Sequence, residues 1–223
     1  PAPVFEPLTS KLYESKLIYH SPTFGDEVRT FCMNPNGEVV QENYSGIATV
    51  NGHSYANYKT PNTNFALLVS EKFTEPFKEP IQYGQHIARL ANMLGGGILV
   101  QRFGDLLEGR RSTPERIASS VITPTLTCAT PGDLSLVIPY RQMTSIIEML
   151  QALDKIAPGT ASRYTLLYGI EVKFYSARVK LTQQLETEGV KNLFTIGDGA
   201  GVTRGLLQAS ASGVYVARTI CER

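Results

Sequence analysis

A run of alternating glycines near the end of the chain restricts the fold more than any other feature. Gly197, Gly199 and Gly201 lie between an apolar segment, 192–196, and a helical pattern over about 203–221. Glycine permits tight turns and lets a ligand approach the backbone amides closely. The unpaired amides of a helix N-terminus favour an anion or a developing negative charge. The pattern therefore predicts a strand–turn–helix unit that can bind a ligand at its turn.

The helix after this turn carries a seam of small residues at helical spacing, Ser210, Gly213 and Ala217. Gly213 inside a helix costs about 1 kcal/mol relative to alanine, so close packing against a sheet is expected to compensate. The motif is no dinucleotide fingerprint, because Val202 and Arg204 stand where GxGxxG needs its last glycine. A turn that merely joins a strand to a helix remains an alternative.

The remainder of the chain changes from β-rich to helix-rich. The first 75 residues alternate β-branched and aromatic residues with turn signals, among them an Asn51-Gly52 pair typical of a hairpin. Helical periodicity follows Pro80 and ends at three consecutive glycines, and Thr113 is expected to cap a short helix. The expected strands are 16–20, 28–33, 38–40, 47–50, 65–70, 98–103 and 166–174, and the expected longer helices are 83–94 and 143–153.

Composition and charge exclude several classes of protein. Hydrophobic residues make up 42% of the 223 residues, no apolar run is long enough for a membrane span, and no signal peptide opens the chain. A net charge of +1 argues against a nucleic-acid partner. Three scattered cysteines give no metal-ligand spacing, so we expect no metal site and a reduced cytoplasmic compartment. The chain starts without methionine, and we expect it to be a piece of a longer protein.

Residues 193–209, LFTIGDGAGVTRGLLQA, resemble the C-terminal signature of FAD-dependent dehydrogenases, where FAD is flavin adenine dinucleotide. The resemblance is strongest to a poorly characterised bacterial branch of NAD/FAD-utilising dehydrogenases. Shorter segments resemble the same branch, and together they cover nearly the whole chain. These segments are RTFCMNP at 29–35, NGHS at 51–54, NFALLV at 64–69, GRRS at 109–112 and GIEVKFY at 169–175.

The resemblance implies a flavin site at the glycine-rich turn. Asp198 would bond a ribityl hydroxyl of FAD, and the amides around Ala200 and Gly201 would approach the pyrophosphate or the pyrimidine edge of the flavin. NAD(P)H is implied as an electron donor. The first βαβ unit of such folds is missing and is expected upstream of Pro1. The expected cofactor-binding residues are Gly197, Asp198, Gly199, Ala200, Gly201, Thr203 and Arg204.

Candidate catalytic residues are weaker. His53 could serve as an acid or base near the flavin, or it could pack locally beside its turn. Lys173 could reach the flavin ring or lie on the exposed side of an edge strand. Arg110, with Arg111, could clamp a carboxylate or phosphate or belong to a solvated loop. Relatives often carry a second cysteine where this chain has Asn34, so a vicinal redox pair with Cys32 is excluded. We expect Cys32 to be a buried structural cysteine, as free cysteines usually are.

We therefore predict an α+β fold in two parts. Residues 1–163 would form an antiparallel β-rich insertion domain with helices, on the substrate side. Residues 164–223 would supply the last strands and helix of a Rossmann-like FAD domain. The expected activity is hydride transfer through flavin N5 to an unknown small-molecule substrate, with this piece inactive alone and able to self-associate through exposed surface. A flavin-dependent RNA-modifying protein and a non-catalytic binding or assembly module remain alternatives.

Overall fold

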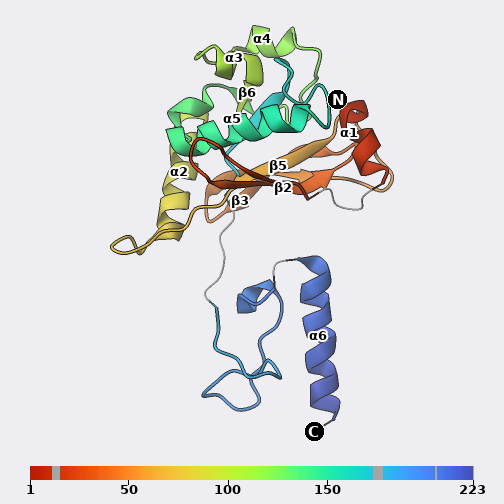
Figure 1. The fold of residues 1–223 in the computed structure, drawn as a ribbon, viewed down its shortest axis with the longest axis vertical. Coiled ribbons are helices and arrows are strands. Elements are labelled where there is room, and N and C mark those ends of the chain that lie inside the picture. Colours follow the sequence, from red (N-terminus) through yellow and green to blue (C-terminus); the bar gives the residue numbers. More distant parts are fainter. Residues whose placement is uncertain (12–15, 173–177, 204, 223) are drawn as a thin grey trace. The chain divides into compact units, whose positions relative to one another are not determined.

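The chain forms two compact units, Pro1–Val172 and Lys173–Arg223, each described by itself below. The computed structural model describes residues 1–11, 16–172, 178–203 and 205–222 (Figure 1). The first unit contains both helices and antiparallel strand pairs, which confirms the α+β class. The domain boundary that the sequence suggested between residues 163 and 164 stays a prediction.

Three small sheets make up the framework of the first unit. The first sheet has the order β1-β2-β5 and the second pairs β3 with β4, both antiparallel. The third sheet has the order β7-β6-β8, with β6 parallel to β7 and antiparallel to β8. The strands are β1 (Ile18–His20), β2 (Glu27–Asn34), β3 (Glu38–Tyr44), β4 (Ile47–His53), β5 (Asn64–Val69), β6 (Leu99–Arg102), β7 (Thr130–Pro131) and β8 (Leu166–Gly169).

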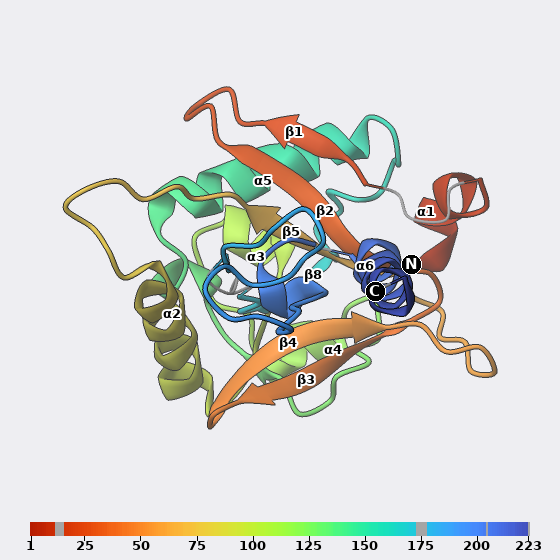
Figure 2. The same cartoon turned by 90° about the horizontal axis from the view of Figure 1, so that it is seen from below.

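Helix α5 (Tyr140–Asp154) covers the first sheet, as seen from below in Figure 2. Its residues Met149 and Leu153 form a buried cluster with Val28 of β2. At the start of the helix, Arg141 donates two hydrogen bonds to the carboxylate of Asp26, Nε to Oδ2 at 2.8 Å and Nη2 to Oδ1 at 2.5 Å. Apolar burial and this ion pair together fix the helix on the sheet.

A larger core lies between α2 (Pro80–Gly95), α5 and the third sheet. It contains nine buried residues from five elements and their connections, so it ties the middle of the chain to the segment after β8. Such a contiguous core gives the unit its independent stability. Its members are Ala91, Leu99, Phe103, Leu106, Leu134, Val137, Met143, Leu150 and Ile170.

The local signals for helices are confirmed. Helix α2 begins at Pro80 and ends at Gly95, and its C-cap Gly96 takes the left-handed conformation with φ 68°. The side chain of Thr113 accepts a hydrogen bond from the Arg116 amide and caps α4 (Pro114–Ala118). The sequence reading missed α1 (Ala2–Thr9), a proline-containing helix whose Phe5 packs edge-on against Phe65 with ring centroids 4.9 Å apart. The short α3 (Phe103–Leu107) and η1 (Leu134–Leu136) complete the unit.

The predicted hairpin turn at Asn51-Gly52 is wrong. Strand β4 runs through both residues, and the hairpin turns instead at Ser45 and Gly46, whose φ values are 52° and 82°. Gly52 is needed for another reason, because a Cβ there would overlap the side chains of Asn64 and Asn34. A close approach between strands, and not a turn, therefore requires glycine at position 52.

The second unit is smaller and differs from the prediction at both sides of the glycine-rich turn. Residues 192–196 form an isolated bridge from Phe194 to Glu186 instead of a buried strand, since no described strand of the unit lies beside them. The turn contains a short 3₁₀ segment, η2 (Asp198–Ala200), and α6 (Leu206–Cys221) begins three residues later than expected over 203–221. The expected strand over 166–174 ends at Gly169, and its residues 173 and 174 lie outside the described residues.

Candidate functional site

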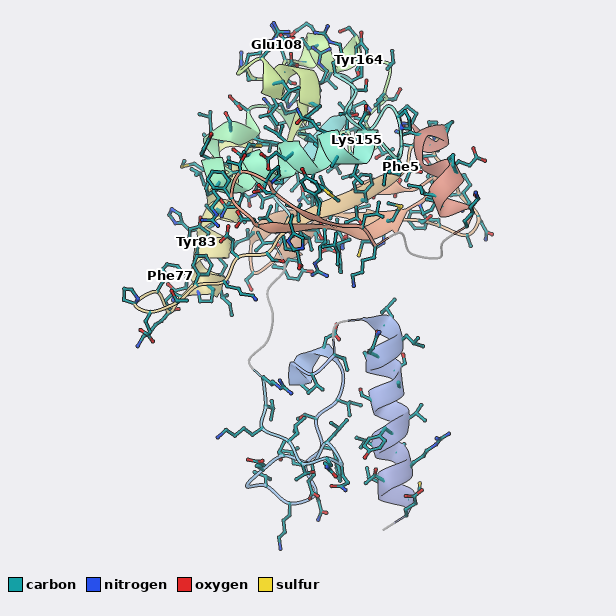
Figure 3. All side chains as sticks on the ribbon, in the orientation of Figure 1. Phe5, Phe77, Tyr83, Glu108, Lys155 and Tyr164 are labelled. Carbon is teal, nitrogen blue, oxygen red and sulfur yellow. The ribbon has the colours of Figure 1, made fainter. Side chains whose placement is uncertain are left out.

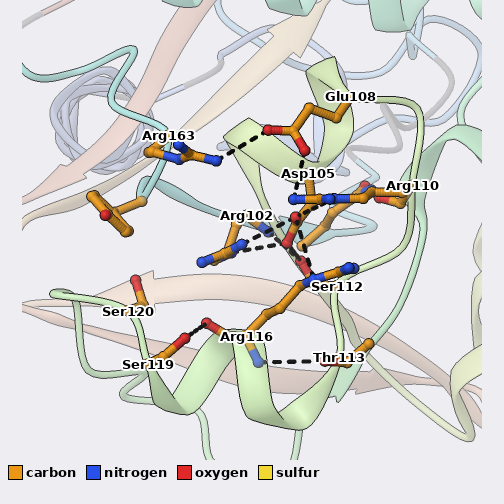
Figure 4. A network of polar contacts seen from close by, with 12 residues as sticks. Arg102, Asp105, Glu108, Arg110, Ser112, Thr113, Arg116, Ser119, Ser120 and Arg163 are labelled. Carbon is orange, nitrogen blue, oxygen red and sulfur yellow. Dashed lines mark hydrogen bonds and ion pairs between the residues drawn. The ribbon is translucent and has the colours of Figure 1, made fainter.

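A buried carboxylate surrounded by arginines is the densest polar cluster that the described residues form (Figure 4). Asp105, in α3, has no exposed side-chain surface. Its Oδ2 accepts hydrogen bonds from Arg102 Nε and Ser112 Oγ, both at 2.8 Å. Its Oδ1 accepts from Arg110 Nε at 2.9 Å and Arg102 Nη2 at 3.1 Å, and Arg116 Nε lies 4.0 Å away. We call Arg102, Asp105, Glu108, Arg110, Ser112, Arg116 and Arg163 the arginine cluster.

The electrostatics of the arginine cluster keep Asp105 ionised. Burial by itself would raise the pKa of Asp105, but hydrogen bonds from Arg102, Ser112 and Arg110 outweigh it and hold the pKa well below its usual range. The hydrogen bond to Asp105 in turn raises the pKa of Arg102. Glu108 is the second anion of the cluster and pairs with Arg110 at 2.5 Å and Arg163 at 3.0 Å.

Three neighbouring elements position the arginine cluster. Arg102 ends β6, and its amide donates to Ser112 Oγ at 2.8 Å. The buried Gln101 next to it donates to the Arg110 carbonyl at 2.9 Å and accepts from the Leu134 amide at 2.8 Å. The segment 109–112 is therefore tied to β6 by both side chain and backbone. Arg102, Asp105 and Ser112 form the buried centre of the cluster, whereas Glu108, Arg110 and Arg163 are partly exposed.

A second polar cluster joins three of the segments that resemble the dehydrogenase branch. Asn34 Nδ2 donates to the Cys32 carbonyl at 2.6 Å and to Asn64 Oδ1 at 3.1 Å. The register of β2 against β5 shifts between Phe31 and Asn34, and Cys32 has a positive φ of 45°. Gly52 of β4 packs directly against both asparagines. Segments 29–35, 51–54 and 64–69, distant in sequence, thus meet at one β-bulge.

The glycine-rich turn is the third candidate, in the second unit. Gly197 and Gly201 have φ values of 70° and 68°, a conformation that favours glycine. Asp198 Oδ1 accepts a hydrogen bond from Thr203 Oγ1 at 2.7 Å, so the two predicted residues are in contact. Gly197 donates from its amide to Ser212 Oγ of α6 at 2.9 Å, which fixes the turn against the helix.

Part of the turn is open to a ligand. Asp198 is exposed and presents carboxylate oxygens that can accept from a sugar-alcohol hydroxyl. Gly199 is exposed as well, and a Cβ there would meet nothing within 4 Å, so a ligand can approach its backbone. The amides of Ala200 and Gly201 already donate within the turn, to Gly197 and Asp198 carbonyls. The implied approach of these two amides to FAD stays a prediction.

The seam of small residues on α6 lies elsewhere than predicted. Ser212 and Val216 are the buried residues of α6, whereas Ser210 and Ala217 are exposed. Gly213 is correctly included, since a Cβ on it would lie 3.6 Å from Ile196 Cδ1. The buried face of α6 differs from the prediction because it packs against the turn and Ile196. Residues 192–196 do not form the strand that was expected to cover the helix.

The structure describes two of the predicted catalytic candidates, Arg110 and His53. Arg110 lies in the arginine cluster, and its guanidinium is already paired with Asp105 and Glu108. His53 ends β4 opposite Glu38, exposed and 6.0 Å from the ring of Tyr55. Lys173 and Arg204 lie outside the described residues.

Sequence reasoning missed Asp105 and Arg163 as site residues. Arg102 and Arg116 lie near Arg110 and Arg111 in the sequence, but nothing in the sequence marks the carboxylate that they share. The remaining signal was the acidic residue three positions after Arg102 at the end of an apolar strand. That spacing makes an ion pair only once the chain turns from β6 into α3.

Neither a metal site nor a membrane span is found in the described parts of the chain. No three His, Cys, Asp or Glu side chains within residues 1–11, 16–172, 178–203 and 205–222 are grouped to hold a metal ion. No helix within these ranges is both long and apolar enough to cross a membrane.

A family model and a relative match the chain. The model described as "FAD-dependent protein, C-terminal domain-like" matches residues 9–174, most of the first unit. A protein of Clostridium beijerinckii described as uncharacterized is 32% identical over an alignment of 220 residues, and the alignment covers 93% of this chain. The chain spans 40% of the length of that relative.

Proposed function

Since this chain belongs to the family of FAD-dependent proteins with a C-terminal domain of this kind, we propose that it is part of an oxidoreductase that transfers hydride through FAD. The single observation that carries the proposal is the family match over residues 9–174, which associates the chain with FAD. The glycine-rich turn lies outside the matched residues and adds independent support, because Asp198 and its open neighbour Gly199 have the groups that a dinucleotide needs.

FAD would supply the hydride-accepting isoalloxazine ring, and the protein would supply binding, orientation and electrostatics. In the second unit we assign binding to the turn at 197–203. Asp198 would accept a hydrogen bond from a ribityl hydroxyl while Thr203 holds the carboxylate in place. Arg204 stays a proposed cofactor-binding residue, and Lys173 stays a proposed residue near the flavin ring. NAD(P)H stays the proposed electron donor.

The first unit would form the substrate side of the protein. Its family-like segments gather at the β-bulge around Cys32 and Asn34 and at the arginine cluster. His53, at the end of the strand that packs on this bulge, stays a proposed acid or base. The second unit alone leaves much apolar surface uncovered, with Leu206 at 87% exposure. Such a surface fits a piece of a larger FAD-binding domain.

Replacement of Asp198 by alanine tests the assignment of the turn. In the full-length protein, Asp198→Ala should weaken FAD binding by roughly tenfold to a hundredfold, because a hydrogen bond to a charged group contributes about 1.5–3 kcal/mol. The measurement is the dissociation constant of FAD by fluorescence titration of the apoprotein.

The matched control is Glu222→Ala, which removes an exposed acid at the other end of α6. FAD affinity should not change in this variant. Equal FAD affinity in Asp198→Ala and the unmodified protein would refute the role of Asp198 and leave the family assignment intact.

A further inference from the structure

The guanidinium of Arg102 has an edge that the arginine cluster leaves unused. Nε and Nη2 both donate to Asp105, whereas Nη1 has no partner among the residues that the structure describes. The side chain is 9% exposed, so the group is held rigidly with only a small part reaching the surface. Two hydrogen bonds to a buried carboxylate fix the plane of this guanidinium before any ligand arrives.

Arg163 is placed next to this edge by the backbone. The amide of Gly104, two residues after Arg102, donates to the Arg163 carbonyl at 3.0 Å. A Cβ on Gly104 would come within 2.7 Å of Arg163 Cβ, so only glycine permits this approach. Arg163 also pairs with Glu108, whose charge acts on Arg102 as well. Glu108 and the neighbouring Tyr164 lie at the same end of the unit (Figure 3).

Figure 4 shows the Arg163 guanidinium and the Ser120 hydroxyl on either side of the outer part of Arg102. Ser120 is half-buried, and its oxygen accepts only a long contact of 3.4 Å from the Ile122 amide. Its hydroxyl hydrogen is therefore available to a ligand. In this view two guanidinium groups and one hydroxyl, from three segments of the chain, lie around the unused edge of Arg102, with Arg163 also directed toward Glu108.

The charge of the cluster favours an anion in that space. Four arginines are joined by ion pairs to two carboxylates, which leaves a net charge of +2. Asp105 is fully buried, and its carboxylate oxygens accept hydrogen bonds from Arg102, Arg110 and Ser112. Guanidinium nitrogens form a planar fork that matches carboxylate and phosphate oxygens. A ligand that accepts a hydrogen bond from Arg102 Nη1 is therefore expected to be an oxyanion.

We propose that Arg102, Arg163 and Ser120 bind an oxyanion, either a carboxylate or a phosphate group of a small molecule. Arg110, which the sequence suggested as the clamp, instead positions Asp105 and through it Arg102. The site lies entirely in the first unit, and it does not depend on the proposed flavin chemistry.

The test is calorimetric titration of the full-length protein with two probes, inorganic phosphate and succinate, at constant ionic strength. Arg163→Gln should weaken binding of the accepted probe by roughly tenfold, since one charge-assisted hydrogen bond is lost. Ser120→Ala should weaken it less, by about threefold, as expected for a neutral donor. Arg163 is 56% exposed, so its replacement is expected to leave folding intact.

The control is Arg89→Gln, which removes the same charge from an exposed position on α2. Binding of phosphate alone supports a phosphate site, binding of succinate alone supports a carboxylate site, and binding of both supports an unselective oxyanion site. The proposal is overturned if neither probe binds, or if Arg89→Gln weakens binding as much as Arg163→Gln does.

Discussion

Asp105 shows how a single residue organises the first unit. Its carboxylate is fully buried, yet the surrounding hydrogen bonds from two arginines and a serine keep it charged. The sequence pointed to the adjacent Arg110 and Arg111, and Arg102 and Arg116 lie nearby in the chain. The aspartate itself could not be singled out, since its burial depends on how β6, α3 and the segment at 109–112 pack together.

We predict that Asp105→Asn strongly destabilises the protein. The substitution leaves Arg102 almost buried without its counter-charge, and breaking a buried pair in this way costs about 3–5 kcal/mol. The free energy of unfolding, measured by urea denaturation at pH 7, gives the value directly. Glu108→Gln is the control, because its exposed ion pairs are worth only about 0–1 kcal/mol.

The same variant has a signature in its pH dependence. The folded-state pKa of Asp105 lies below its unfolded value of about 3.9, so its stabilisation is complete above that pH and is lost as the pH falls below it. Between about pH 5 and pH 3 the unmodified protein should therefore lose more stability than Asp105→Asn does. Parallel pH curves for the two proteins would contradict this account of the arginine cluster.

At the scale of elements, helices were predicted better than strand pairs. Pro80, the glycines at 95–97 and Thr113 act within one or two turns of their own helix, so their effect can be seen locally. Pairing of β6 with both β7 and β8 joins segments far apart in sequence, and no local signal records it. The pair Asn51-Gly52 misled the prediction because its glycine is needed for contact with Asn64.

The hairpin that the structure places at Ser45 and Gly46 gives an element-scale prediction. Both residues have positive φ, and asparagine tolerates that conformation better than serine. Ser45→Asn should therefore stabilise the protein by roughly 0.5 kcal/mol, a typical gain for an improved turn. The thermal unfolding midpoint is the measurement.

The control for the hairpin is the position where the sequence suggested the turn. Asn51 Nδ2 donates to Glu42 Oε1 at 2.7 Å across the β3–β4 pair, so Asn51→Ser should lower the unfolding midpoint. A drop in the midpoint for Ser45→Asn, or a rise for Asn51→Ser, would contradict the observed register.

For the whole molecule, the sequence indicated an FAD-dependent family and an α+β fold, and both are confirmed at that level. The family match covers residues 9–174, so it rests on the first unit and not on the glycine-rich turn. Local sequence patterns do not predict the substrate or the redox partner, because each depends on surfaces built from distant segments. The chain spans 40% of the length of its relative.

The visible absorption spectrum of the purified full-length protein tests the central claim most directly. We predict flavin bands near 370 and 450 nm, as oxidised FAD gives in general, that bleach when a reductant is added under anaerobic conditions. A colourless protein that stays colourless after incubation with FAD would contradict the oxidoreductase assignment and leave a binding or assembly module.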